Sequence, residues 1–317
     1  MAQVSANSGT AKPTNNGNKS GSGNNVKTAA GVNAQPGQVA TPVRAAPFKI
    51  ETPSTRKRHL KLLVYGDYGS GKTTLAGSAT MCSQMSDVLL IDAESGDLSL
   101  DEFPGLDTIR ITDFKTMGQV HTFLKRHCKL RDEGDTEGLR ELQAMLRGEV
   151  PEGEEPKRYN TIIIDSLTEV ETFCMYQLLG INDQTKMDEE VATAEWSEYK
   201  RNHQMIQRMV RQFRDLPMNV IFTCARAYVQ DESKKMIYNP ALTGKLASQI
   251  QGFMDMVGYL VVAQPQDPEK PPPRRLYVQP SSAGRYSAKS RFASYKGTYF
   301  DDPTMESILS AVGLLQQ

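Results

Sequence analysis

The sequence predicts an α/β fold, in which helices flank a mostly parallel central sheet and a late pair of antiparallel strands extends it. Three observations predict this fold. A glycine-rich turn lies between an apolar strand and a helix within residues 60–76. Short apolar runs bounded by turn residues recur along the chain, as in strands buried on both faces of a parallel sheet. Helical patterns alternate with these runs, which is the order of β-α-β units.

Length, charge and cysteine usage narrow the class of protein. The chain has 317 residues, with 37 Lys plus Arg and 37 Asp plus Glu, so its overall charge indicates no particular partner. A nucleic-acid surface must therefore be a local patch. The cysteines are widely scattered and form no C-x-x-C pair; they are Cys82, Cys128, Cys174 and Cys224. This favours reduced core cysteines in a cytoplasmic protein. No apolar run is long enough to predict a membrane partner.

The N-terminal segment differs in composition from the rest of the chain. Residues 1–47 contain no aromatic and no acidic residue and are rich in Gly, Asn and Ala. Such a segment buries too little apolar surface to offset its ordering entropy, so we predict a disordered, weakly basic tail and a folded domain at 48–317. Phe48 and Ile50 begin the apolar pattern and suit a short strand on this domain or on a neighbouring subunit. The basic run 56–59 is either a solvated lead-in or a phosphate-contacting patch.

The remaining elements follow from the hydrophobic pattern. Strands are predicted at 60–65, 87–92, 108–111, 161–165, 219–224, 257–263 and 275–278. Helices are predicted after the glycine turn to about residue 82, and at 114–130, 136–146, 167–179, 194–215, 246–254 and 303–315. Pro217 ends the long helix 194–215, and residues 225–241 are predicted to be a loop. One stripe of that helix and its end is expected to face the core: Trp196, Tyr199, Ile206, Met209, Val210, Phe213 and Leu216.

The glycine turn carries the pattern G-x-x-x-x-G-K-[ST], with Gly66, Gly71, Lys72 and Thr73 in the fixed positions. Glycines let the main chain approach a ligand closely, and backbone N–H groups then point at an anion. Lys72 is expected at the β- and γ-phosphates of a nucleoside triphosphate, and the Thr73 hydroxyl at Mg²⁺. The residues expected to contact the nucleotide are Gly66, Asp67, Tyr68, Gly69, Ser70, Gly71, Lys72, Thr73 and Thr74.

Carboxylates at strand ends are candidates for metal binding and for orienting water. Asp165 ends an apolar strand and is predicted to be the Mg²⁺-side acid; a role as helix N-cap is the alternative, although Ser166 is available as cap. Many P-loop ATPases have a glutamate directly after this aspartate, but here Ser166 follows. Glu94, at the end of the neighbouring strand, is the candidate that orients the attacking water, with Glu169 as the alternative.

Cations and polar groups further along the chain are candidates for contacts with the γ-phosphate. Thr223 and Arg226 lie at the end of the fifth predicted strand, where a polar residue can sense that phosphate. Lys289 and Arg291 lie two residues apart, on one face if extended. They are predicted either to reach the γ-phosphate of a neighbouring subunit, as arginine fingers do, or to form a solvated basic strand.

These motifs together resemble the RecA-like recombinase core. The resemblance rests on GDYGSGKT, IDAESG, TIIID and the late K-x-R, in that order. More narrowly, the chain resembles phage-encoded RecA-like ATPases, the phage nucleotide-binding and single-strand annealing proteins. W-x-x-Y before the long helix, NVIFTCAR, P-x-L-x-G-K and DMVGYL add to it, over residues 58–310. The chain departs from RecA in lacking a glutamine at the end of the fifth strand and in having no F-x-x-A assembly motif in its N-terminal tail.

The resemblance implies a RecA-like fold, ATP hydrolysis at subunit interfaces, filament or ring assembly and action on single-stranded DNA. It implies that Lys289 and Arg291 act in trans and that a single-strand DNA-binding protein is a further partner. The DNA-facing loop would lie at 227–242, where charge and stacking rings combine in Tyr228, Lys234, Lys235 and Tyr238. The expected function is ATP-dependent annealing or strand exchange. The alternatives are a helicase-loading or replicative motor and a nucleotide-gated assembly module.

Overall fold

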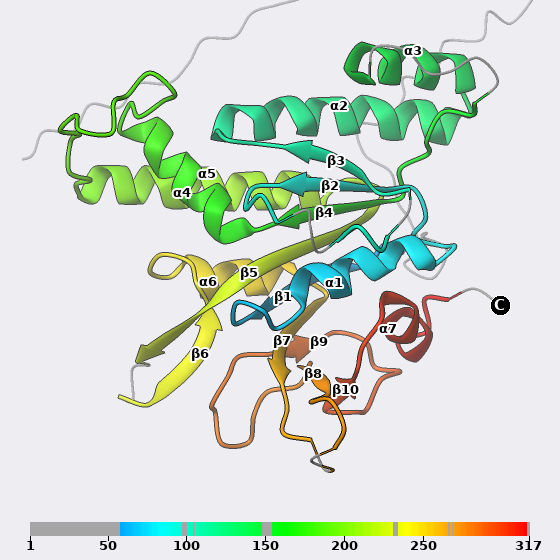
Figure 1. The fold of residues 1–317 in the computed structure, drawn as a ribbon, viewed down its shortest axis with the longest axis vertical. Helices are drawn as coiled ribbons and strands as arrows, with labels where there is room; N and C mark the ends of the chain where they lie inside the picture. The colour runs from blue at the N-terminus through cyan, green and yellow to red at the C-terminus, as the bar shows by residue number, and fades with distance from the viewer. Residues whose placement is uncertain are drawn as a thin grey trace, which may run out of the picture. The chain divides into compact units, whose positions relative to one another are not determined.

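The central sheet orders its strands as β10-β8-β7-β1-β5-β4-β2-β3, with β6 paired to β5 and β9 paired to β7 (Figure 1). This computed structural model describes residues 58–96, 100–103, 105–147, 154–230, 234–265, 267 and 269–315. They belong to one unit, residues 55–317. The strands are β1 Lys61–Gly66, β2 Val88–Asp92, β3 Asp107–Arg110, β4 Thr161–Asp165, β5 Asn219–Gln230, β6 Met236–Pro240, β7 Met256–Val262, β8 Arg274–Tyr277, β9 Lys289–Ser290 and β10 Tyr299–Asp301.

Helices connect these strands in the predicted alternation. They are α1 Lys72–Gly77, the short 3₁₀ helix η2 Ser78–Met81, α2 Phe114–Glu133, α3 Thr136–Arg147, α4 Leu167–Leu178, α5 Trp196–Arg214, α6 Leu246–Phe253 and α7 Met305–Ala311. The pairs β1–β5, β1–β7, β2–β3, β2–β4 and β4–β5 are parallel, whereas β7–β8 and β8–β10 are antiparallel. The predicted architecture, a mostly parallel central sheet flanked by helices with a late antiparallel extension, is therefore confirmed.

Two hydrophobic cores cover the two faces of the sheet. On one face, Leu63 and Ile164 pack with residues of α2, α4, α5 and α6. On the other face, Leu90, Ile163 and Ile221 pack with residues of α1 and α7. Side chains alternate between faces along a strand, so the residues two positions beyond these three also lie on the α1 face. Those residues are Asp92, Asp165 and Thr223.

Several expected elements need correction. Much of the predicted loop at 225–241 is strand, because β5 continues to Gln230 and pairs antiparallel with β6 at 236–240. Trp196 and Tyr199 do not face the core: 83% and 43% of their surfaces are exposed, since they lie in the first turn of α5, whereas Ile206 and Phe213 further along are buried. The short strand β10 is absent from the predicted strands, whereas β9 begins at Lys289, where a basic strand was one of the two predicted alternatives.

Other expectations lie outside the described residues. The proposed boundary between residues 47 and 48, the disordered tail, and the possible strand at Phe48 and Ile50 belong to this group. Among the described residues, none of the helices combines the length and the apolar character needed to cross a bilayer. All four cysteines are free and buried.

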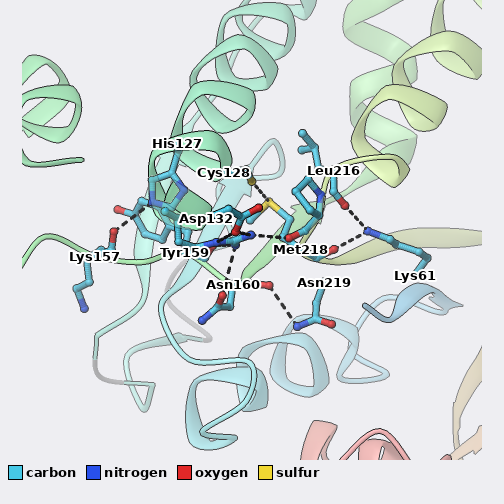
Figure 2. Close-up of polar contacts among 12 residues, drawn as sticks. Lys61, His127, Cys128, Asp132, Lys157, Tyr159, Asn160, Leu216, Met218 and Asn219 are labelled. Carbon is cyan, nitrogen blue, oxygen red and sulfur yellow. Dashed lines mark hydrogen bonds and ion pairs between the residues drawn. The ribbon is translucent and has the colours of Figure 1, made fainter. Parts of the chain in front are cut away.

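Polar contacts tie the amino ends of the strands together (Figure 2). Asn219 accepts a hydrogen bond from Leu60 N at 2.9 Å and donates to Asn160 O at 3.2 Å, which joins the starts of β1, β4 and β5. The Lys61 ammonium donates to the carbonyl oxygens of Leu216 at 2.8 Å and Met218 at 2.5 Å. These contacts lie at the amino ends of the parallel strands, whereas the glycine turn lies at their carboxyl ends. We therefore assign them a structural role.

Lys61, at the amino end of β1, makes the stability of the protein depend on pH. Burial lowers the pKa of Lys61 from 10.5 to about 8, although Asp255 opposes the shift. Between these values the unfolded chain binds more protons than the folded chain, so the free energy of unfolding rises with pH in this window. Relative to Lys61→Met, the wild type should gain up to about 3 kcal/mol between pH 8 and pH 10.5, measured by urea unfolding. Parallel pH curves for the two proteins would contradict the assignment.

Candidate nucleotide site

The glycine turn follows β1 and leads directly into α1. Gly71 has a φ of 92°, in the left-handed region that favours glycine, and its carbonyl accepts the Leu75 N–H at 2.9 Å. The Ser70 hydroxyl donates to Asp67 O at 2.8 Å and closes the turn. Lys72 is buried, and its ammonium donates to the carbonyl oxygens of Gly66 at 3.3 Å and Asp67 at 2.9 Å. The glycine turn thus holds the ammonium of its own lysine through two carbonyl oxygens; the backbone N–H groups of the turn are the groups that would cradle a phosphate.

The rest of the turn divides into buried and exposed positions. Ser70 is buried, whereas Tyr68 is 80% exposed, with the Lys72 ammonium 5.8 Å from its ring centroid. Thr74 lies in the first turn of α1 and lines a cavity of about 250 Å³ beside Gly71. The turn therefore presents one aromatic ring to solvent next to the expected phosphate position.

Gly66 is required by the close approach of two strands. A Cβ at this position would lie 2.3 Å from the backbone oxygen of Leu260 and 2.8 Å from Ser70 Oγ. Gly66→Ala should therefore force β1 and β7 apart and lower the free energy of unfolding by ~3 kcal/mol or more, measured by chemical denaturation. Gly69→Ala is the matched control, because no atom lies within 4 Å of its Cβ and only its φ of +74° is strained. That strain costs about 1 kcal/mol. Equal losses in the two variants would contradict the steric explanation.

Thr73, Asp165 and Thr223 meet on the α1 face of the sheet. The Thr73 hydroxyl donates to Asp165 Oδ2 at 2.6 Å, and the buried Thr223 hydroxyl donates to Asp165 Oδ1. Asp165 is itself buried, at the end of β4. Ser166, not Asp165, is the N-cap of α4, which leaves the aspartate oriented by two hydroxyls.

This oxygen set fits Mg²⁺. The ion prefers oxygen ligands, keeps several waters, and is commonly bound through one or two carboxylates plus substrate phosphates. Thr73 Oγ1 would be the direct protein ligand, and Asp165 would act through a bound water. Thr223 contacts Asp165, so the structure places it on the expected metal side of the site.

Glu94 lies beside this group. Its carboxylate accepts a hydrogen bond from the Ser166 hydroxyl, and its side chain is exposed enough to meet solvent. Desolvation raises the pKa of Glu94, and the Asp165 charge adds to that shift, while the Ser166 hydrogen bond and Lys72 oppose it. Glu169 contributes its backbone N–H to the Ser166 cap at 3.5 Å. The geometry therefore brings Glu94 next to the expected metal side, as a water-orienting group requires.

Arg226 connects the glycine turn to the β5–β6 hairpin. Its guanidinium forms an ion pair with the Asp67 carboxylate and donates to the Tyr259 hydroxyl at 3.1 Å. It also lies over the Tyr238 ring, 4.4 Å from the centroid. Arg226, which belongs to β5, thus pairs with Asp67 of the glycine turn while its guanidinium packs on the Tyr238 ring of β6.

The four residues expected to contact DNA differ in their availability. Tyr228 is 57% exposed and packs on Tyr238, with ring centroids 4.8 Å apart. Tyr238 is half-buried, because its ring also packs against Tyr259 at 5.6 Å. Lys234 and Lys235 are exposed in the connection between the strands, and the Lys235 ammonium donates to Ala283 O. Tyr228 and Lys234 are therefore the more accessible pair.

Lys289 and Arg291 lie toward the amino ends of the parallel strands, whereas the glycine turn lies at their carboxyl ends. Lys289 pairs with Val257 at the start of β7, whereas Gly66 pairs with Leu260 further along that strand. Arg291 donates to Gly252 O at 2.6 Å and lies 3.6 Å from Asp255. The two cations therefore do not belong to the nucleotide site of their own subunit.

Sequence reasoning missed two residues at the site, Asp92 and Arg274. Asp92 is 2% exposed and pairs in register with Asp165. It stands in the IDAESG run that pointed to Glu94, so a signal was present. The Arg274 side chain packs against Gly71, where a Cβ would lie 2.7 Å from its Cζ, and it lines the cavity beside Thr74. No local pattern marks Arg274, because the pairing of β7 with β8 brings it there.

One family model and one solved structure are similar to this chain. A family model described as "AAA domain" matches residues 58–292. A solved structure described as the crystal structure of the RadB recombinase is similar over 68% of this chain and 78% of that chain, with 17% identity and a TM-score of 0.33. No curated protein matches the sequence. The narrower grouping with phage-encoded proteins stays a prediction.

Proposed function

We propose that this chain, which belongs to the AAA domain family, binds and hydrolyses ATP and uses it to act on single-stranded DNA in recombination. One observation carries the nucleotide half of the proposal. Thr73 Oγ1 of the glycine turn lies 2.6 Å from Asp165 Oδ2 at the end of β4. Two residues 92 positions apart in sequence thereby form the oxygen pair that a nucleotide-bound Mg²⁺ requires.

Each residue then has a role in hydrolysis. The turn and Lys72 would hold the phosphates, and Thr73 with Asp165 would hold Mg²⁺. When bound there, the ion would supply positive charge to offset the charge that develops on the transferred phosphoryl group. Glu94 orients the attacking water. Lys289 and Arg291 of a second copy supply the remaining positive charge, so hydrolysis belongs to an assembled filament or ring.

The β5–β6 hairpin supports the DNA half of the proposal. Tyr228 offers an exposed ring, and Lys234 an exposed ammonium at the turn. A stacking ring next to a cation binds single strands without requiring a particular sequence. Such a surface suits annealing or strand exchange, with a single-strand DNA-binding protein as an additional partner. The buried free cysteines suit work in the cytoplasm, that of the host if the protein is phage-encoded.

The direct test is ATP turnover with and without single-stranded DNA, together with DNA retention in a gel shift. Turnover should rise when DNA is added, and Tyr228→Ala with Lys234→Ala should weaken DNA binding about tenfold, from the loss of one stacked base. The matched control is Tyr176→Ala with Lys129→Ala, which removes an exposed tyrosine and an exposed lysine from α4 and α2. If ATP turnover were not stimulated by single-stranded DNA and no DNA were retained in the gel shift, the protein would be an ATPase without the proposed DNA function.

Other functions give different results in the same assays. Directional displacement of a paired strand would indicate a helicase-loading or replicative motor. Unchanged function in Glu94→Gln would indicate a nucleotide-gated assembly module, because such a module needs binding without hydrolysis.

A further inference from the structure

Asp92 is a buried carboxylate beside the proposed metal side. It ends β2, is 2% exposed, and pairs in register with Asp165 of the parallel strand β4. Register partners on parallel strands project from the same face, and both residues lie on the α1 face, as does Thr223. The carboxylates of Asp92 and Asp165 are therefore neighbours on the face that carries the nucleotide turn.

One oxygen of Asp92 holds the turn that presents Glu94. Asp92 Oδ1 accepts hydrogen bonds from the backbone N–H groups of Glu94 at 3.1 Å and Gly96 at 3.3 Å. Ser95, between them, has a φ of 58°. The main chain on the other side is fixed as well, because Ala93 N donates to Asp165 O at 2.7 Å. The Glu94 backbone is thus positioned by Asp92 and by β4, and its side chain by Ser166.

The other oxygen of Asp92 has no such partner. Asp92 Oδ2 is buried and makes no hydrogen bond within the described residues. A buried polar atom without a partner costs free energy and calls for an explanation. The turn does not explain it, since an asparagine would offer the same Oδ1 acceptor. A second carboxylate next to Asp165 also adds repulsion, which a divalent cation nearby would offset.

We propose that Asp92 is a positioning residue that links the metal side of the site to Glu94. Its Oδ1 fixes the Glu94 turn, and its Oδ2 accepts a hydrogen bond from water in the shell of the nucleotide-bound Mg²⁺. Nucleotide binding would then set the angle at which Glu94 meets the attacking water. This inference rests on the proposed hydrolysis and names a residue of the same site.

Two substitutions separate the two roles. Asp92→Asn keeps the Oδ1 acceptor and removes the second anionic oxygen. Asp92→Ala removes both, so the N–H groups of Glu94 and Gly96 lose their acceptor. Full-length proteins should be compared by circular dichroism and thermal unfolding first, so that a folding defect is recognised.

The first readout is hydrogen exchange of single backbone amides in protein without nucleotide. Exchange at Glu94 and Gly96 should be at least tenfold faster in Asp92→Ala and unchanged in Asp92→Asn. The second readout is the Mg²⁺ concentration that gives half-maximal binding of a fluorescent ATP analogue. It should rise about fivefold or more in Asp92→Asn. Unchanged exchange in the alanine variant, or an unchanged Mg²⁺ requirement in the asparagine variant, would overturn the corresponding role.

The third readout is turnover. Asp92→Ala should lower kcat about 100-fold while nucleotide affinity at saturating Mg²⁺ changes little, because misplacement of a catalytic group by about 1 Å costs that much. Adding Asp92→Ala to Glu94→Gln should lower kcat no further, since Asp92 acts through Glu94. Losses that multiply, or an Asp92→Ala protein as active as wild type, would overturn the inference alone. A wild type without turnover would overturn the proposed hydrolysis, and the first two readouts would still decide the two contacts of Asp92.

Discussion

Replacing both late cations, in Lys289→Ala/Arg291→Ala, is expected to lower ATP turnover by about 10³-fold or more, the effect typical of a trans-acting cation. Lys289 lies in β9, which pairs with the start of β7, and Arg291 follows it, so both are away from the glycine turn of their own subunit. Nucleotide binding by the isolated subunit should therefore be unchanged. Phosphate release and binding of a fluorescent ATP analogue measure the two quantities separately.

A mixing experiment tests whether these cations act between subunits. Lys72→Ala removes the phosphate contact but keeps the cations, whereas the cation double variant keeps the glycine turn. Each protein alone should be inactive, and their mixture should regain turnover at interfaces where one supplies the turn and the other the cations. If the mixture showed no ATP turnover, or if the cation double variant alone were fully active, Lys289 and Arg291 would be a solvated basic strand without a role in hydrolysis.

Glu94→Gln is expected to lower turnover by about 10²- to 10⁴-fold, the range for losing a group that takes part in proton transfer. Glutamine keeps the shape of the side chain and an acceptor for the Ser166 hydroxyl, but it cannot take a proton. Nucleotide affinity should change by no more than a few-fold, because the glycine turn and the Thr73–Asp165 pair remain. Single-turnover phosphate release and equilibrium binding give the two values.

Glu169→Gln is the matched control for Glu94→Gln. Glu169 lies in the first turn of α4 and was the alternative water-orienting residue. It should retain most of the turnover, because the Ser166 hydroxyl donates to the Glu94 carboxylate, whereas Glu169 meets Ser166 through its backbone N–H. The reverse outcome, an active Glu94→Gln and an inactive Glu169→Gln, would transfer the role to Glu169.

The sequence predicted the part of the site that is local in the chain. The glycine turn, the strand ending at Asp165 and the strand preceding Glu94 each carry their own pattern of apolar residues and breakers. Parallel strands have their carboxyl ends on the same side of the sheet. The fold class therefore predicted that the glycine turn, Asp165 and Glu94 lie close together.

The sequence could not supply the features that depend on distant pairing. Arg274 reaches Gly71 only because β8 pairs with β7. The helical spacing that included Trp196 and Tyr199 correctly predicted α5. Periodicity does not say, however, which turns of a helix pack on the core and which are exposed. The 225–241 segment contains polar residues typical of a loop, yet cross-strand contacts such as Tyr228 with Tyr238 stabilise a hairpin there.

The Arg226 contacts would link ligand binding at the glycine turn to ligand binding at the hairpin. Arg226 pairs with Asp67 at one end and packs on Tyr238 at the other. A ligand that draws Arg226 away from Asp67 alters the free energy of the turn, and a nucleotide that rearranges Asp67 alters the support of the Tyr238 ring. Linkage of this kind is reciprocal. Whatever factor ATP applies to the affinity of a ligand on the hairpin, that ligand applies the same factor to the affinity for ATP.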